Sequence, residues 1–133
     1  MELKKSFLAG EEIYKAGQNS NGAFIIRSGT VSLYTSMDFH LVTLGEGELF
    51  GELGQIVDEQ RSVTAIARTD CLLRHIPQNI LDEKFNNTDP AIVGMFRALA
   101  IRLRKANDQK VQMWTEIERL RESKKIYLVS YYY

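Results

Sequence analysis

The chain has 133 residues, of which 44% are hydrophobic and 26% charged, and these proportions predict one soluble globular domain. Its 17 basic and 17 acidic residues cancel, so the sequence lacks the electrostatic footprint of a protein that binds nucleic acid or an anionic membrane. A single cysteine, Cys71, excludes an internal disulfide framework and any four-cysteine zinc or iron–sulfur site. There is no apolar run of membrane-spanning length and no signal-peptide pattern at residues 1–10, which predicts a cytoplasmic protein.

Residues 7–76 alternate short apolar segments with turn residues, which predicts a β-rich region. The polar cluster at residues 18–22 and the Ser28-Gly29 pair are typical of turns, and residues 36–38 fit a hairpin tip. Strands this short, closed by turns, favour a small roll or barrel. The predicted strands are 12–14, 23–27, 31–35, 41–44, 63–67 and 71–76.

After Pro77 the hydrophobic period changes from that of strands to that of helices. Residues 79–85 predict a short helix, and Thr88 or Asp89 followed by Pro90 is typical of the start of a second one. We expect one domain over residues 1–123, made of a β-roll at 7–76, a short helix with a linker at 77–89, and a long helix at 90–123. Residues 124–133 match none of these patterns and stay unassigned.

Apolar side chains recur along the long helix at alternating intervals of four and three residues, which is the a/d seam of a coiled coil. A seam of this length predicts a parallel homodimer through residues 92–120, with Lys110 as its one polar member. The alternative is an amphipathic helix that lies on the roll, and both can hold if the first turns cover the roll and the later turns cover a partner. The seam consists of Ile92, Phe96, Leu99, Leu103, Ala106, Lys110, Met113, Ile117 and Leu120.

Two short segments carry groups that suit a ribose phosphate: Phe50-Gly51-Glu52-Leu53-Gly54 and Arg61-Ser62-Val63-Thr64-Ala65. A carboxylate such as that of Glu52 accepts hydrogen bonds from sugar hydroxyls, and the guanidinium of Arg61 offers a planar fork to phosphate oxygens. Ser62 adds a hydroxyl, and nearby main-chain N–H groups add donors. From composition alone, a surface carboxylate is the favoured interpretation of Glu52, and a solvated loop arginine is the alternative for Arg61. The flanking Phe50-Gly51 and Leu53 reverse the preference for Glu52, and the apolar segment that Arg61-Ser62 opens strengthens the signal of Arg61.

These segments, read together as FGELGQIVDEQRSVTA, resemble the phosphate-binding cassette of the cyclic-nucleotide-binding domain family, and SGTVSLY and LGEGELFGE upstream are similar to it too. Two positions depart from the common pattern, Gly54 in place of alanine and Val63 in place of a small residue, and neither removes a polar contact. The resemblance implies a mainly β domain with added α: a jelly-roll-like β-roll, a short helix and a long C-terminal dimerisation helix. It assigns Glu52 to the ribose 2′-hydroxyl and Arg61 and Ser62 to the cyclic phosphate.

The resemblance also implies where the rest of the ligand lies. Gly51, Leu53 and Gly54 belong to the cassette turn, where Gly51 lets the main chain approach the sugar. Leu33 and Val42 lie on strands that line the pocket, although both are equally consistent with plain β-core. Asn107, whose amide is able to pair with an adenine edge, lies where catabolite-activator-like members contact the base, and a solvated helix asparagine is the equal alternative.

Catalytic and metal chemistry find little support in the sequence. His40, Cys71 and His75 do not form a metal-binding set, because positions 71 and 75 on a strand are too far apart to share an ion. There is no nucleophile with a base and an orienting group, and no catalytic carboxylate pair, which argues against an enzyme.

The sequence therefore predicts a cyclic-nucleotide sensor without a cofactor of its own, with cAMP as the leading ligand and cGMP as the other. Ligand occupancy would be relayed through the long dimerising helix, without contact to nucleic acid or membrane. The first alternative is the ligand-sensing fragment of a catabolite-activator-type transcription regulator, separated from its DNA-binding part. The second alternative is a dimerising scaffold that binds no nucleotide.

Overall fold

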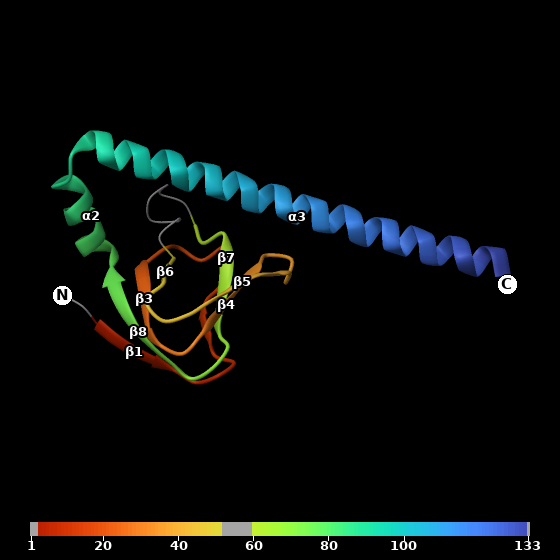
Figure 1. Ribbon diagram of the computed structural model, residues 1–133, viewed down its shortest axis with the longest axis horizontal. Helices are drawn as coiled ribbons and strands as arrows, with labels where there is room; N and C mark the ends of the chain where they lie inside the picture. Colours follow the sequence, from red (N-terminus) through yellow and green to blue (C-terminus); the bar gives the residue numbers. More distant parts are fainter. Residues whose placement is uncertain (1–2, 52–59, 133) are drawn as a thin grey trace.

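The computed structural model describes residues 3–51 and 60–132, with side chains as far as Lys124. Strands fill the first half of the chain and helices the second, with the long helix lying along one side of the β-roll (Figure 1). The mixed β/α architecture predicted from the sequence is confirmed. Its elements are β1 (Leu3–Phe7), β2 (Glu12–Tyr14), β3 (Gly22–Ser28), β4 (Val31–Thr35), β5 (His40–Leu44), β6 (Leu49–Phe50), β7 (Val63–Ala67), β8 (Cys71–Pro77), α2 (Gln78–Asn86) and α3 (Pro90–Tyr132).

The described strands form two antiparallel sheets of four strands each. One sheet has the order β1-β8-β3-β6 and the other β2-β7-β4-β5, so chain neighbours such as β3 and β4 lie in different sheets. Two registers position the site. Phe24 of β3 pairs with Phe50 of β6, and Leu33 of β4 pairs with both Val42 of β5 and Ala65 of β7.

Strands β2, β4 and β7 coincide with their predicted ranges, and β3, β5 and β8 are one or two residues longer than predicted. The predicted strands did not include β1, although Leu3–Phe7 pairs along its length with β8. This segment escaped notice because two lysines break its apolar pattern and none of its residues is fully buried. The two-residue strand β6 was also missed, since so short a strand has no alternation to detect.

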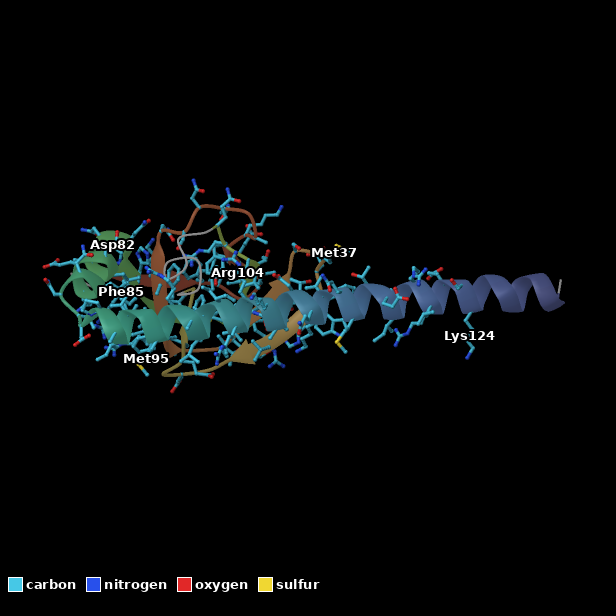
Figure 2. All side chains as sticks on the ribbon, turned by 90° about the horizontal axis from the view of Figure 1, so that it is seen from above. Met37, Asp82, Phe85, Met95, Arg104 and Lys124 are labelled. Atoms are coloured by element: carbon cyan, nitrogen blue, oxygen red, sulfur yellow. The ribbon has the colours of Figure 1, made fainter. Side chains whose placement is uncertain are left out.

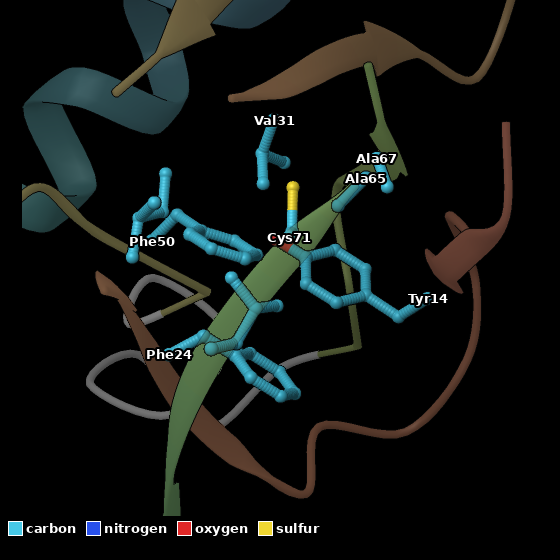
Figure 3. Close-up of a cluster of buried hydrophobic side chains, with 9 residues drawn as sticks. Tyr14, Phe24, Val31, Phe50, Ala65, Ala67 and Cys71 are labelled. Atoms are coloured by element: carbon cyan, nitrogen blue, oxygen red, sulfur yellow. The ribbon is translucent and has the colours of Figure 1, made fainter. Parts of the chain in front are cut away.

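The core lies between the two sheets and is rich in aromatic rings. Figure 3 shows Tyr14, Phe24 and Phe50 gathered around the start of β8. The ring centroids of Phe24 and Phe50 are 5.3 Å apart, and that of Tyr14 lies 6.0 Å from Phe50. Offset aromatic contacts of this kind add about 0.5–1.5 kcal/mol each to the free energy of burial. The stack therefore fixes the cassette entrance at Phe50 against the body of the roll.

The turn before β3 needs glycine for a steric reason. Gly22 has φ of +126°, and a Cβ placed on it would come within 2.0 Å of the Ile76 carbonyl oxygen. The close approach of the two main chains lets β3 enter the sheet beside β8, so any larger residue would displace the strand. The predicted hairpin tip at residues 36–38 is also present, where Asp38 adopts φ of +64°.

The long helix begins at Pro90, as predicted, and Asp89 is its N-cap residue. Asp89 Oδ1 accepts a hydrogen bond of 2.8 Å from the Ala91 amide, whereas Thr88 Oγ1 donates to the Lys84 carbonyl of α2. The helix was expected to end near Ser123 but continues to Tyr132. The reason is local, because residues 124–132 contain neither glycine nor proline, the residues that end helices most effectively.

One face of α3 packs on the roll and an adjacent face is exposed. Ala100 is buried, and Val93, Arg104, Asn107, Val111 and Trp114 are half-buried at the same helical spacing. The predicted seam is offset from this face by one residue, which is about 100° around the helix. Its members are all exposed in the single chain, with Leu99 61% and Met113 65% exposed. Figure 2 shows Arg104 over the roll and Lys124 well beyond it, so the helix outruns the surface it covers.

Candidate nucleotide-binding site

A pocket of about 420 Å³ lies between the roll and α3. Its walls come from β2, β4, β5, β6, the start of β7 and the middle of α3, so only the folded domain assembles it. The lining residues are Tyr14, Leu33, Leu41, Val42, Leu44, Leu49, Phe50, Gly51, Arg61, Ser62, Val63, Leu103, Asn107 and Lys110.

Arg61 is the buried cation of this pocket, only 4% exposed. Its Nη2 donates to Asn21 Oδ1 at 2.9 Å and to the Gly22 carbonyl at 2.7 Å, and its Nη1 donates to the Gly51 carbonyl. The guanidinium carbon also lies 4.0 Å from the centroid of the Tyr14 ring, a cation–π contact. These contacts fix both the plane and the position of the guanidinium at the pocket wall.

The main chain of Arg61 is held as firmly as its side chain. The Arg61 amide donates to the Gln18 carbonyl at 2.8 Å, and the Arg61 carbonyl accepts from the Gly17 amide at 2.8 Å. The residue is therefore anchored to the loop between β2 and β3 before β7 begins. Ser62 follows at the pocket wall and leads directly into that strand.

Gly51 is needed where the cassette turn meets Arg61. Its φ is +82°, and a Cβ at this position would lie 2.7 Å from Arg61 Nη1. A side chain here would push the guanidinium away from the Gly51 carbonyl that it contacts. Glycine at position 51 thus leaves room for the Arg61 guanidinium and also lets the main chain approach a bound sugar.

The wall opposite α3 is apolar and comes mainly from β4 and β5. Leu33 and Val42 face each other across these strands, and Leu41, Leu44 and Val63 complete the surface. Val42 is 41% exposed although it is aliphatic, because it borders the pocket and not the core. An apolar wall of this kind suits the flat face of a purine base.

Helix α3 forms the lid of the pocket through Leu103, Asn107 and Lys110. It is fastened to the roll at two points, one on each side of Asn107 and Lys110. Arg104 Nη2 donates to the Gln60 carbonyl at 2.9 Å, and the ring centroid of Trp114 lies 5.1 Å from that of Phe39, beside the β4–β5 hairpin tip. A base in the pocket would therefore lie beneath the segment between these two anchors.

The structure brings together six of the nine predicted site residues around one pocket: Leu33, Val42, Gly51, Arg61, Ser62 and Asn107. Glu52, Leu53 and Gly54 fall outside the described residues, so their roles stay predictions. Sequence reasoning missed Asn21, which orients Arg61 from 40 residues away, and it treated Lys110 only as a seam residue. The sequence offered a signal for Lys110, because it lies three residues after Asn107 and therefore on the same face of the helix.

His75 and Cys71, which we interpreted from the sequence as structural residues, have partners within the roll. His75 Nε2 lies 3.0 Å from the Asn21 carbonyl and its ring stacks on Phe24, while burial, with the nearby charges of Lys5 and Arg61, lowers its pKa. Cys71 Sγ lies 3.1 Å from the main-chain oxygens of both Thr30 and Thr69, and its one S–H is placed to donate to either of them. Over residues 3–51 and 60–124, no cluster of three or more histidine, cysteine or acidic side chains is placed to hold a metal ion.

Comparison of the sequence with protein families identifies the kind of domain that holds this pocket. A family model described as the cyclic nucleotide-binding domain matches residues 4–88, which run from the second residue of β1 to beyond the end of α2. The chain belongs to the cyclic nucleotide-binding domain family. In its described part, no helix has the length and apolar character needed to cross a membrane.

Curated relatives in this family are regulatory subunits. The chain is 39% identical over 64 residues to the cAMP-dependent protein kinase regulatory subunit of Eremothecium gossypii, covering 48% of this chain and 14% of the relative. It is 34% identical over 68 residues to the type II regulatory subunit of Drosophila melanogaster, covering 49% and 18%. The chain thus spans less than a fifth of the length of these relatives.

Solved structures extend the likeness into α3. The cAMP-bound form of the EAL enzyme Bd1971 superposes with a TM-score of 0.75 at 26% identity, over 89% of this chain and 32% of that one. Its cGMP-bound form gives 0.73 at 25% identity over the same shares. The catabolite activator protein of Thermus thermophilus gives 0.63 at 22% identity, over 84% and 53%, and supports the fold alone. The likeness therefore covers most of the chain and not only the roll and α2.

Proposed function

We propose that this domain binds cAMP or cGMP in the pocket under α3 and reports its occupancy through that helix, without catalysing a reaction. The observation that carries the proposal is Arg61, a buried arginine held in a fixed plane at the wall of a pocket of about 420 Å³. An arginine oriented in advance attracts a phosphate without first losing rotamer freedom, and its contacts with Asn21, Gly22 and Gly51 keep its positive charge at a fixed place on the pocket wall.

The rest of the ligand follows from the geometry of the walls. With the phosphate at Arg61 and Ser62, the ribose would lie at the Gly51 turn, where Glu52, Leu53 and Gly54 continue the cassette. The base would then lie between the apolar wall at Leu33 and Val42 and the lid at Asn107. The polar Arg61 and Ser62 suit the phosphate, and the apolar wall suits the base.

The proposed relay is a population shift of α3. A ligand that contacts both the Arg61 wall and the Asn107 lid favours the docked position of the helix over undocked ones. In a parallel dimer through residues 92–120, both helices would move together and transmit the change to an output. A cytoplasmic location suits this role.

Calorimetry with cAMP and cGMP tests the proposal directly. We expect saturable binding with one site per chain and an upward shift of the melting temperature. Arg61→Lys keeps the charge but loses the planar fork, so it should weaken binding at least tenfold. The matched control is Arg68→Ala, which removes an exposed cation seven residues away and should leave the affinity within about twofold.

Two results would overturn the proposal. One is the absence of heat and of a thermal shift with both nucleotides at millimolar concentration. The other is an unchanged affinity in the Arg61→Lys variant. The first result, combined with a dimer in solution, would favour the scaffold function instead, since the exposed seam on α3 would then be the only active surface of those described.

A further inference from the structure

Lys110 lies at the lid of the pocket, although its place in the heptad pattern points to the helix seam. Of the nine seam residues, only Leu103 and Lys110 line the pocket, while the neighbouring Met113 is 65% exposed outside it. A lysine in an otherwise apolar seam costs stability in a dimer. A role in the pocket gives this cation a physical reason to occupy that position.

The ammonium group of Lys110 is held in place by an aromatic ring. Its Nζ lies 5.2 Å from the centroid of the Trp114 ring, within the range of a cation–π contact. Trp114 in turn contacts Phe39, next to the β4–β5 hairpin tip. The two rings connect Lys110 to the roll, so its ammonium is exposed but held beside the pocket.

Lys110 and Asn107 differ in what they can recognise. The Asn107 amide has both donors and an acceptor and can adapt to either purine by turning over. The Lys110 ammonium has three donors and no acceptor, so it requires an acceptor on the base. In guanine the O6 and N7 atoms are adjacent acceptors, whereas in adenine the amino group N6 places donor hydrogens beside N7.

From this chemistry, and resting on the function proposed above, we propose that Lys110 reads the 6-keto edge of the purine and gives the pocket a preference for cGMP over cAMP. The phosphate is assigned to Arg61 on the roll side of the pocket, so the cation on the α3 side is left to the base. The preference is carried by one residue of the lid and not by the apolar wall, which contacts both bases equally well.

The test measures the affinities of the wild-type protein and of Lys110→Met for cGMP, cAMP and cyclic inosine monophosphate, which has O6 but lacks the 2-amino group. We expect the wild type to bind both 6-keto nucleotides about tenfold more tightly than cAMP. In Lys110→Met this ratio should fall to about twofold, through loss of affinity for the keto nucleotides. Methionine keeps the helix propensity and the length of the stem.

Lys105→Met is the matched control, because it removes an exposed cation from the same helix outside the pocket and should preserve the ratio. An equal loss of all three ligands in Lys110→Met would assign Lys110 to general attraction of the phosphate and overturn the inference. A wild-type preference for cAMP over the two keto nucleotides would also overturn the inference. Binding of none of the three nucleotides by the wild type would instead overturn the proposed function itself.

Discussion

Arg104 and Gln18 hold opposite sides of one peptide unit, the unit that joins Gln60 to Arg61. Arg104 Nη2 donates to the Gln60 carbonyl at 2.9 Å, and the Arg61 N–H donates to the Gln18 carbonyl at 2.8 Å. The first contact comes from α3 and the second from the loop between β2 and β3. The long helix is therefore linked through a single peptide group to the arginine assigned to the phosphate.

Arg104→Gln should loosen this peptide unit. Loss of a charge-assisted hydrogen bond at a half-buried position removes about 1 kcal/mol, enough to speed exchange of the Arg61 amide hydrogen several-fold. We also expect nucleotide affinity to fall by a similar factor, because the lid docks less firmly. Hydrogen exchange with mass spectrometry measures the first effect, and Lys105→Gln is the control for charge. Unchanged exchange at Arg61 would show that α3 does not hold the cassette through Arg104.

Arg61→Ala should destabilise the fold as well as abolish binding. The substitution leaves Asn21 Oδ1 and the carbonyls of Gly22 and Gly51 without their guanidinium donors in a buried place, and it removes the cation–π contact with Tyr14. A loss of about 2–4 kcal/mol in the free energy of unfolding is expected. Urea titration measures it, with Arg68→Ala as the exposed control. A loss below about 1 kcal/mol would mean that other groups replace these donors.

Comparison of Gly51→Ala with Gly47→Ala separates the cost of the left-handed backbone from the cost of crowding the Arg61 guanidinium. Alanine at φ of +82° costs about 1–2 kcal/mol wherever it occurs. Gly47 has nearly the same φ, +83°, and no heavy atom of the described residues lies within 4 Å of where its methyl group would be, so Gly47→Ala carries the backbone cost alone. We expect Gly51→Ala to be the less stable variant in thermal melts and to bind nucleotide more weakly. Equal effects of the two substitutions would show that the guanidinium moves aside freely.

The two parts of the site differ in how far the sequence predicted them. Arg61 and Gly51 belong to a continuous segment whose order and spacing carry the family pattern, so the sequence alone identifies them. Asn21, which orients Arg61, lies 40 residues away in a turn cluster, and no local pattern connects the two. For Lys110 the spacing was visible, but the heptad pattern could not tell which side of the helix faces the roll. That choice depends on tertiary contacts such as Trp114 with Phe39.

The strands of the fold also differ in how far the sequence predicted them. Strand β7 was predicted within its bounds because apolar residues fill it and turn residues flank it. Strand β1 was missed because its stability comes from pairing with β8, more than sixty residues later in the chain, and not from its own composition. Local propensity therefore located the strands with a clear apolar pattern, the edge strands β2 and β5 among them, while β1 needed the complete sheet.

His75 predicts how stability depends on pH. Burial is the main cause that lowers its pKa from the usual value of about 6.5, and Lys5 and Arg61 act in the same direction. The unfolded chain therefore binds a proton at a higher pH than the folded chain does, so stability should fall as the pH drops below about 6.5. Urea titrations at pH 7 and pH 5.5 should show a larger decrease for the wild type than for His75→Gln. His40→Gln, at an exposed histidine bonded to Thr43, should retain the wild-type decrease; equal slopes in all three proteins would assign the effect to other groups.

The exposed seam of α3 predicts an association that a single substitution can disrupt. Leu99 is 61% exposed in the single chain, so Leu99→Glu should leave the stability of the monomer nearly unchanged. In a parallel dimer the same substitution places two carboxylates at an apolar seam, which opposes pairing strongly. Sedimentation should show a two-chain mass for the wild type and a one-chain mass for Leu99→Glu.

Ala98→Glu is the matched control for this experiment. It adds the same charge one residue earlier, at an exposed position about 100° around the helix from the seam, and should remain dimeric. Dissociation of both variants would point to general charge repulsion, and a wild-type monomer at high micromolar concentration would remove the dimer from the proposed relay. Nucleotide binding by the Leu99→Glu monomer would then show that the pocket under α3 is complete in one chain, because Asn107 and Lys110 come from the same chain as Arg61.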